Sequence, residues 1–193
     1  MKKYPIILDL ETQKTFREES DPAKLGISVV AIYDYEDQKG KVYTEKEVNQ
    51  LFPILEKASY IIGYNSVAFD IPVLQGYYPG DVNNFSQFDI MEDIRSKIGR
   101  RLGLNDLAGA TLNIKKSGHG LMAIDYFKEG KWDELKKYCL DDVLVTKDLF
   151  EHGVEKGYVM YKNERGVINV DVSWKKYKDG NGSVSDMPLT LPF

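Results

Sequence analysis

The chain has 193 residues, of which 42% are hydrophobic and 29% charged, and its formal net charge is −4. This length suits one globular domain with its own core, and the composition carries no low-complexity or disorder signature. The negative charge excludes a general attraction to nucleic acid or to an anionic membrane, so a polyanionic partner would need a local basic patch or bound metal.

Cysteine and histidine usage excludes two further classes of site. Cys139 is the only cysteine, so an internal disulfide and a cysteine-rich zinc site are both impossible. The two histidines, His119 and His152, give little support to histidine-based zinc chemistry. Because we find neither a signal-peptide pattern nor an apolar run long enough to span a bilayer, we expect a soluble, cytoplasmic protein.

The N-terminal part of the chain predicts three strands and a helix. Residues 5–11 are mostly apolar and residues 25–35 are rich in β-branched and aromatic side chains, so both segments are expected to be strands. Turn residues after the second strand favour an antiparallel return over 41–44. Apolar residues at helical spacing over 48–58 predict the helix, in which Pro53 is a candidate kink.

The rest of the chain alternates short strands and helices. We expect a strand at 60–64, the end of a turn-rich stretch at 88–90, and helices over 67–75, 90–98, 104–112, 121–127 and 132–156. Residues 158–162 and 167–172 flank a turn and predict a β-hairpin, and the tail from Ser173 is expected to be a loop. The predicted fold class is therefore α/β, a mixed β-sheet flanked by helices with a C-terminal hairpin appendage.

Asp9 and Glu11 stand one residue apart at the end of the first apolar run. On a strand, side chains two residues apart face the same way, so both carboxylates would project together. One interpretation is a polar strand end that leads into a turn. The other is a divalent metal site, because hard cations such as Mg²⁺ bind carboxylate oxygens and cancel the repulsion between them.

Asp70 lies early in the helix expected after the strand at 60–64. An acid in this place can simply stabilise the helix terminus. It can also be a third carboxylate at the edge of the sheet where open α/β folds bind their ligands. In that case Asn65 and Phe69 would lie beside it as a polar contact and a stacking contact.

Tyr138 and Asp142 are four residues apart on the long helix and therefore share one face. Asp142 interrupts the apolar stripe of that face, whereas Asp141 lies about 100° further round the helix. A carboxylate directed at the core is costly unless a cation or a metal accompanies it. The alternative is that both acids lie on a solvated face, with Tyr138 an ordinary core tyrosine.

In chain order, these residues give D-x-E on the first strand, N-x-x-x-F-D at a strand-to-helix junction and Y-x-x-x-D on a late helix. This order resembles the DnaQ-like, or DEDD, superfamily of 3′–5′ exonucleases on the ribonuclease-H-like fold. The histidine subtype would place its histidine at the position of Lys137, so Tyr138 is similar to the residue of the tyrosine subtype. Segments 102–108 and 116–123 resemble, more loosely, proofreading domains of family B polymerases and stand-alone relatives.

The resemblance implies an exonuclease domain over 1–157, and we expect the hairpin and tail over 158–193, which lie outside the motifs, to pack on the same domain. It also implies two divalent ions, Mg²⁺ or Mn²⁺, held by four acids: Asp9, Glu11, Asp70 and Asp142. Asp9 would bridge both ions, and Asp70 would support one of them partly through water. Glu11 and Asp142 would bind the ion that carries the attacking water. Tyr138 would orient that water as a neutral hydroxyl.

The implied substrate is the 3′ end of single-stranded nucleic acid, DNA rather than RNA, from which nucleoside 5′-monophosphates are released. Expected substrate contacts are Leu10, Thr12, Tyr64, Asn65 and Phe69, with the two aromatic rings as stacking candidates. Candidate phosphate contacts, which otherwise belong to a solvated face, are Lys97, Arg100, Arg101, Lys115 and Lys116, and His119 either approaches the site or lies on a loop.

Two other functions stay open at this point, a noncatalytic nucleic-acid-binding module and an endonuclease with the same site. A helicase or polymerase partner, the oligomeric state and the pathway, whether repair, proofreading or turnover, stay open as well.

Overall fold

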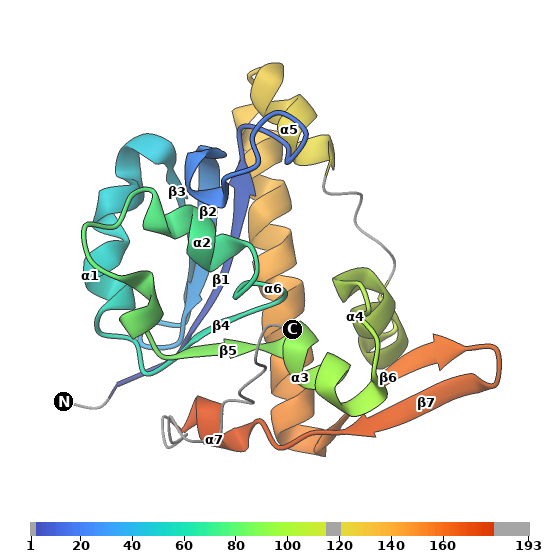
Figure 1. The fold of residues 1–193 in the computed structure, drawn as a ribbon. Coiled ribbons are helices and arrows are strands. Elements are labelled where there is room, and N and C mark those ends of the chain that lie inside the picture. The colour runs from blue at the N-terminus through green and yellow to red at the C-terminus, as the bar shows by residue number, and fades with distance from the viewer. Residues whose placement is uncertain (1–2, 115–120, 180–193) are drawn as a thin grey trace.

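The computed structural model describes residues 3–114 and 121–179 of the chain. Its centre is a mixed five-stranded sheet with the strand order β3-β2-β1-β4-β5 (Figure 1). The central strand β1 pairs antiparallel with β2 and parallel with β4, so the predicted mixed sheet is confirmed. The strands are β1 (Ile6–Thr12), β2 (Ile27–Asp34), β3 (Lys39–Thr44), β4 (Ile61–Gly63) and β5 (Gln87–Asp89).

Helices cover both faces of this sheet (Figure 1). They are α1 (Phe52–Leu55), α2 (Asp70–Gln75), α3 (Ile90–Ile98), α4 (Leu104–Leu112), α5 (Leu121–Lys128) and α6 (Trp132–Lys156). The longest, α6, lies across β1 and β2 and ends at Gly157, whose left-handed φ of 76° suits a glycine. Among the described helices, none combines the length and the apolar character that crossing a bilayer requires.

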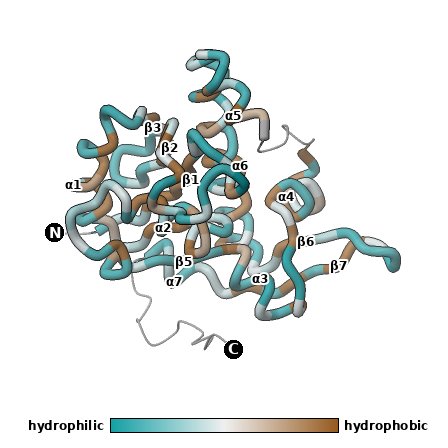
Figure 2. The backbone as a smooth tube through the Cα atoms, turned by 45° about the horizontal axis from the view of Figure 1, so that its top comes forward, coloured by the Kyte–Doolittle hydropathy of each residue, from teal (hydrophilic) through white to brown (hydrophobic). Residues whose placement is uncertain are grey.

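The two faces of β1 belong to two different hydrophobic cores. Ile7 lies in the core that α6 covers, whereas Leu8 and Leu10 lie in the core that α1 and α2 cover. Because side chains alternate along a strand, Asp9 and Glu11 continue the row of Ile7 and face α6. Figure 2 shows the hydrophobic segments concentrated in the sheet and the hydrophilic ones in the hairpin tip and outer turns.

Three expectations about local structure were wrong. The helix expected over 48–58 is a 3₁₀ segment, Glu45–Gln50, followed by the short α1, and Pro53 lies in the first turn of α1, where its missing N–H is harmless. The segment at 88–90 is not the end of a turn region, because Gln87–Asp89 pairs with β4 as a third parallel strand.

The third correction concerns the tail from Ser173, which does not form a plain loop in its described part. A short helix, α7 (Lys175–Lys178), follows Trp174, whose side chain is only 1% exposed. The indole ring stacks on Phe150 at a centroid distance of 6.0 Å, and its Nε1 donates to Asp93 Oδ2 at 2.8 Å. This tryptophan therefore fastens the C-terminal segment to α6 and α3.

The predicted hairpin is present as β6 (Tyr158–Asn163) and β7 (Gly166–Asp171), paired antiparallel. Strand β6 packs against α4, where the Thr111 hydroxyl donates to the Met160 carbonyl at 3.0 Å and accepts from the Met160 N–H at 2.8 Å. The hairpin thereby extends the structure beside α4, on the side away from β3 (Figure 1).

Gly153 provides a test of how Trp174 is seated. A Cβ at Gly153 would lie 2.2 Å from the indole ring, so Gly153→Ala should displace Trp174 and lower the free energy of unfolding by about 1–3 kcal/mol. Gly109→Ala in α4 is the matched control, because its Cβ would meet nothing closer than 3.5 Å and should raise stability by roughly 0.5–1 kcal/mol. Urea unfolding measures both, and equal stability of Gly153→Ala and the unchanged protein would contradict this packing.

Candidate active site

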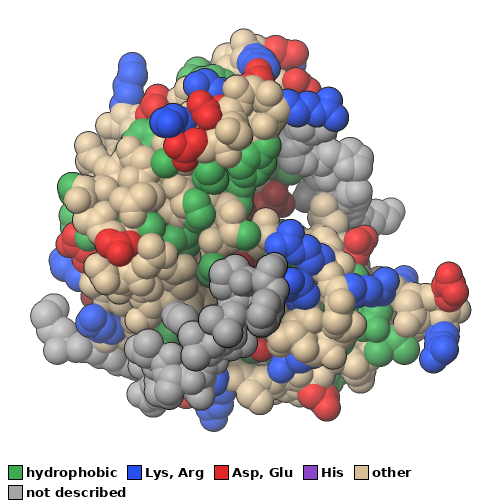
Figure 3. Space-filling model, in the orientation of Figure 1, with side chains coloured by type: hydrophobic (Ala, Val, Ile, Leu, Met, Phe, Trp, Pro, Cys, Tyr) green, Lys and Arg blue, Asp and Glu red, His purple; other side chains and the backbone are tan. Residues whose placement is uncertain are grey.

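Three acids from two elements converge beside the sheet. Asp9 and Glu11 come from the end of β1, and Asp142 comes from α6. One carboxylate oxygen from each lies within 4.8 Å of the other two. Figure 3 shows a hollow over this region, with acidic side chains recessed in it and Lys and Arg side chains on its rim.

Asp70, the first residue of α2, is joined to this group through the backbone of β1. The pairing of β1 with β4 ends at Ile7, so the Leu10 N–H has no strand partner on that side. Asp70 Oδ1 accepts this N–H at 2.9 Å, and the Asp70 side chain is 3% exposed. Because Leu10 stands between Asp9 and Glu11, this bond holds the start of α2 at the acidic end of β1.

Desolvation raises the pKa of all four acids, and repulsion by neighbouring carboxylates adds to the rise, from Asp89 on Asp70 and from Asp141 on Asp142. The pKa of Asp9 and of Glu11 lies well above the ordinary range, first because the surrounding protein takes these half-buried groups largely out of water and then because of neighbouring carboxylates, Asp70 and Asp142 among them. Burial also raises the pKa of Asp70 to about 8, against the opposing effect of the Leu10 N–H. For Asp142 burial raises the pKa to about 6, and a hydrogen bond from Tyr138 opposes the rise.

This donor set fits hard divalent cations. The grouped ligand atoms are all carboxylate oxygens, which Mg²⁺ and Mn²⁺ prefer, and the described part of the chain adds no histidine or thiolate to the group. Carboxylates that repel one another and hold protons are the groups from which a bound cation displaces those protons. Asp9, Glu11 and Asp142, three of the four acids expected from the sequence, therefore form a cluster whose chemistry suits such a cation.

The neighbours of Asp142 on α6 have distinct places. The Tyr138 hydroxyl hydrogen-bonds to Asp142, and burial, together with that carboxylate, raises the pKa of Tyr138, so its hydroxyl stays neutral. Asp141 instead forms an ion pair with Lys137. The helix therefore brings Asp142, and not Asp141, to the β1 acids.

Cys139 also contacts the site, and sequence patterns gave no signal for this contact. Its Sγ lies 3.5 Å from the Asp9 carbonyl oxygen and 3.8 Å from Asp9 Oδ2, so its single S–H has both oxygens within reach as acceptors. Burial raises the pKa of Cys139 well above its ordinary value, so the group remains a thiol. The buried Cys139 side chain thus contacts both the backbone and the carboxylate of Asp9.

The residues around Asp70 occupy different environments. Asn65 has a left-handed φ of 63°, and its Oδ1 is buried without a hydrogen-bond partner in the described structure. Phe69 is half-buried and meets Phe16 edge-on at a centroid distance of 5.6 Å. Phe16, which is 53% exposed, was not singled out in the sequence, where it is an isolated aromatic residue in a polar stretch. Tyr64 packs against the core under α6, and its hydroxyl donates to the Leu102 carbonyl at 2.8 Å.

Two expected substrate contacts have buried side chains. Leu10 is 3% exposed and belongs to the core under α1 and α2, so its role at the site is the backbone bond to Asp70. Thr12 is 5% exposed, and its hydroxyl donates to the Lys14 carbonyl at 2.8 Å. Neither side chain presents a free polar group toward the acids.

Three of the expected phosphate contacts are described. Lys97 lies 3.6 Å from Asp93, Arg101 lies 3.7 Å from Glu92, and Arg100 lies over the Tyr161 ring, 5.1 Å from its centroid. The remaining basic and histidine candidates, Lys115, Lys116 and His119, lie outside the described residues.

Comparisons with known proteins agree with this architecture. Residues 6–154 match the sequence profile of the RNase H superfamily, whereas no curated protein sequence matches the chain. The structure is similar to the family B DNA polymerase from the hyperthermophilic archaeon Pyrobaculum calidifontis, with a TM-score of 0.61 and 21% identity over 79% of this chain and 24% of that one. It is also similar to RNase D of Trypanosoma brucei, with a TM-score of 0.58 and 15% identity over 78% of this chain and 57% of that one. The chain thus spans 24% and 57% of the lengths of these proteins, and the two likenesses show the fold.

The raised pKa values predict how metal and pH act together on stability. Asp142 and Asp70 have pKa values of about 6 and about 8 when folded, against an ordinary 3.8. Without metal, what these acids contribute to stability is therefore greatest below pH 3.8 and is lost as the pH rises through 6 and 8. Because Mn²⁺ binds the ionised carboxylates, the rise in Tm that it causes should be larger at pH 8 than at pH 6.

Thermal unfolding with Mn²⁺ or with EDTA measures this difference. Asp142→Asn should remove most of the Mn²⁺-induced rise, whereas Asp141→Asn, one position along the same helix, should retain it. Equal rises in the two variants would show that Asp142 is not a metal ligand.

Proposed function

The chain belongs to the RNase H superfamily, and on this basis we propose that it is a metal-dependent 3′–5′ exonuclease that acts on single-stranded nucleic acid. The observation that carries the proposal is the convergence of Asp9, Glu11 and Asp142 within 4.8 Å, with Asp70 hydrogen-bonded to the strand that bears two of them. The ribonuclease-H-like fold expected from the sequence motifs is confirmed by the profile match, which covers every one of these acids.

The acids would hold two divalent ions, either Mg²⁺ or Mn²⁺. Asp9 would help to hold both ions, Glu11 and Asp142 one of them, and Asp70 the other. When bound, the ions would supply an activated water molecule and positive charge beside the phosphodiester in its transition state.

Tyr138 is proposed to position the attacking water. Its neutral hydroxyl already hydrogen-bonds to Asp142 and is too weak an acid to exchange its proton near neutral pH. The water oxygen forms a new bond to phosphorus while the bond to the 3′ oxygen of the shortened strand breaks. The 3′ oxygen takes up a proton, and the released product is a nucleoside 5′-monophosphate.

The substrate would be held next to Asp70. The edge-on pair of Phe69 and the exposed Phe16 offers an aromatic surface on which a terminal base of any sequence can stack. Asn65, with its unpartnered Oδ1, is proposed as a polar contact to the strand end. Single-stranded DNA is the proposed preference, by the resemblance of the motifs to proofreading domains.

Labelled oligonucleotides test the proposed reaction directly. With Mn²⁺, a 5′-labelled single strand should give a ladder in steps of one nucleotide, and a 3′-labelled strand should give labelled mononucleotide from the start. Internal cuts would instead indicate an endonuclease, and binding without cleavage a noncatalytic module. The same assay with a DNA strand and with an RNA strand shows whether the site accepts a 2′ hydroxyl. If the purified protein hydrolyses neither strand with Mg²⁺ or with Mn²⁺, the enzyme proposal is refuted.

Substitutions test which acids matter. Asp9→Ala and Asp142→Asn should each lower the rate by more than about 100-fold, because each removes part of a several kcal/mol stabilisation of transition-state charge. Asp141→Asn should stay within about twofold of the unchanged protein, since only an exposed ion pair is lost. Single-turnover rates measure the series, and a comparable loss in Asp141→Asn would mean that the wrong acid is assigned.

A further inference from the structure

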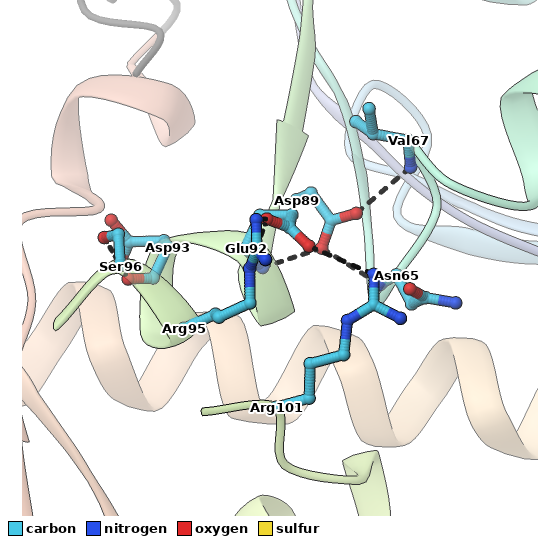
Figure 4. Close-up of polar contacts among 8 residues, drawn as sticks. All are labelled: Asn65, Val67, Asp89, Glu92, Asp93, Arg95, Ser96 and Arg101. Carbon is cyan, nitrogen blue, oxygen red and sulfur yellow. Dashed lines mark hydrogen bonds and ion pairs between the residues drawn. The ribbon is translucent and has the colours of Figure 1, made fainter. Parts of the chain in front are cut away.

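Asp89 is a buried acid outside the metal-binding group. It ends β5, immediately precedes α3, and is 6% exposed. Its carboxylate accepts three backbone N–H groups, from Asn65 at 2.9 Å and Glu92 at 3.2 Å on Oδ1 and from Val67 at 3.0 Å on Oδ2 (Figure 4). In the described part of the chain its charge is thus met by backbone donors rather than by Lys or Arg.

The bond to Glu92 is an ordinary N-cap of α3, but the other two bonds reach a loop that precedes Asp89 by 22 and 24 residues. We propose that Asp89 is a positioning residue of the acidic site, which sets the place of Asp70 by clamping this loop. The inference rests on the proposed function, because it concerns the same metal-binding acids.

Hydrogen bonds joined by short stretches of backbone lead from Asp89 to β1. Ser66, in the middle of the clamped loop, has a carbonyl that accepts the Ile71 N–H at 2.9 Å. Ile71 follows Asp70, whose Oδ1 accepts the Leu10 N–H at 2.9 Å. Displacement of the loop would therefore move Asp70 relative to Asp9 and Glu11.

The loop needs an acceptor because of its tight geometry. Asn65 has a left-handed backbone, and a Cβ at Gly63 would lie 2.5 Å from the Ser66 side chain, so the chain folds back closely on the end of β4. The turn directs the N–H groups of Asn65 and Val67 to the same side, toward Asp89, and each would lose its acceptor without that carboxylate. The carboxylate of Asp89 satisfies both of them with charge-assisted bonds.

Two substitutions distinguish the bonds of Asp89 to the loop from its N-cap bond to α3. Asp89→Asn replaces one accepting oxygen by an amide that cannot accept an N–H. Asp89→Ser retains a good N-cap for α3. Its side chain is shorter and has a single oxygen, which cannot reach both loop N–H groups, those of Asn65 and Val67. Asp93→Asn is the matched control, because Asp93 lies one turn further along α3 and binds Trp174 Nε1 rather than the loop.

The test measures Mn²⁺ affinity by isothermal titration and by the Mn²⁺-induced rise in Tm, together with kcat and KM. For both Asp89 variants we expect Mn²⁺ affinity and kcat to fall by about 10- to 100-fold, as for loss of an outer partner of a metal ligand. Excess Mn²⁺ should restore part of kcat, and KM for the oligonucleotide should stay unchanged. Asp93→Asn should lower Tm without changing Mn²⁺ affinity.

The proposal is overturned if Asp89→Ser binds Mn²⁺ as tightly as the unchanged protein, or if its losses match those of Asp93→Asn. Asp89→Ser decides the question even if Asp89→Asn does not fold. An unchanged protein that binds Mn²⁺ but hydrolyses no strand would refute the proposed exonuclease, while the Mn²⁺ affinities of the variants would still test the clamp.

Discussion

The arrangement of the site depends on one electrostatic constraint, the crowding of three half-buried carboxylates close to the buried Asp70. Asp9 and Glu11 occupy positions on β1 that face α6, in line with the core residue Ile7, and Asp142 meets them from that helix. Burial and repulsion raise the pKa of each acid, so the metal-free cluster is costly for the fold. Divalent cations bound to these carboxylates would offset that cost.

The fold holds these acids with hydrogen bonds from neighbouring elements. Leu10 N–H holds Asp70, Tyr138 holds Asp142, and the Cys139 thiol lies against Asp9. The bond to Leu10 is available only because β4 stops short of the end of β1, which leaves a backbone donor unpaired at the edge of the acidic group. The short pairing between β4 and β1 therefore explains how Asp70 can bind the backbone of β1 beside the other acids.

Periodic patterns made much of this predictable from the sequence. The strands at 5–11 and 25–35, the long helix and the hairpin follow from side-chain spacing, as does the separation of Asp142 from Asp141 by helical angle. The three residues of β5 follow a turn-rich stretch and lack an apolar run like the one at 60–64 that marked β4, so both the strand and the buried Asp89 escaped prediction. The packing of Trp174 was not predicted for a different reason. Its indole ring lies against Gly153, a contact between distant segments that exists only in the folded structure.

The most direct test of the central claim is anomalous diffraction from crystals of the protein soaked in Mn²⁺. The account predicts two ordered Mn²⁺ ions about 4 Å apart, with Asp9 contacting both and with Glu11, Asp70 and Asp142 completing their ligands. Crystals that show no ordered Mn²⁺ at these acids, or ions bound only elsewhere on the surface, would contradict it.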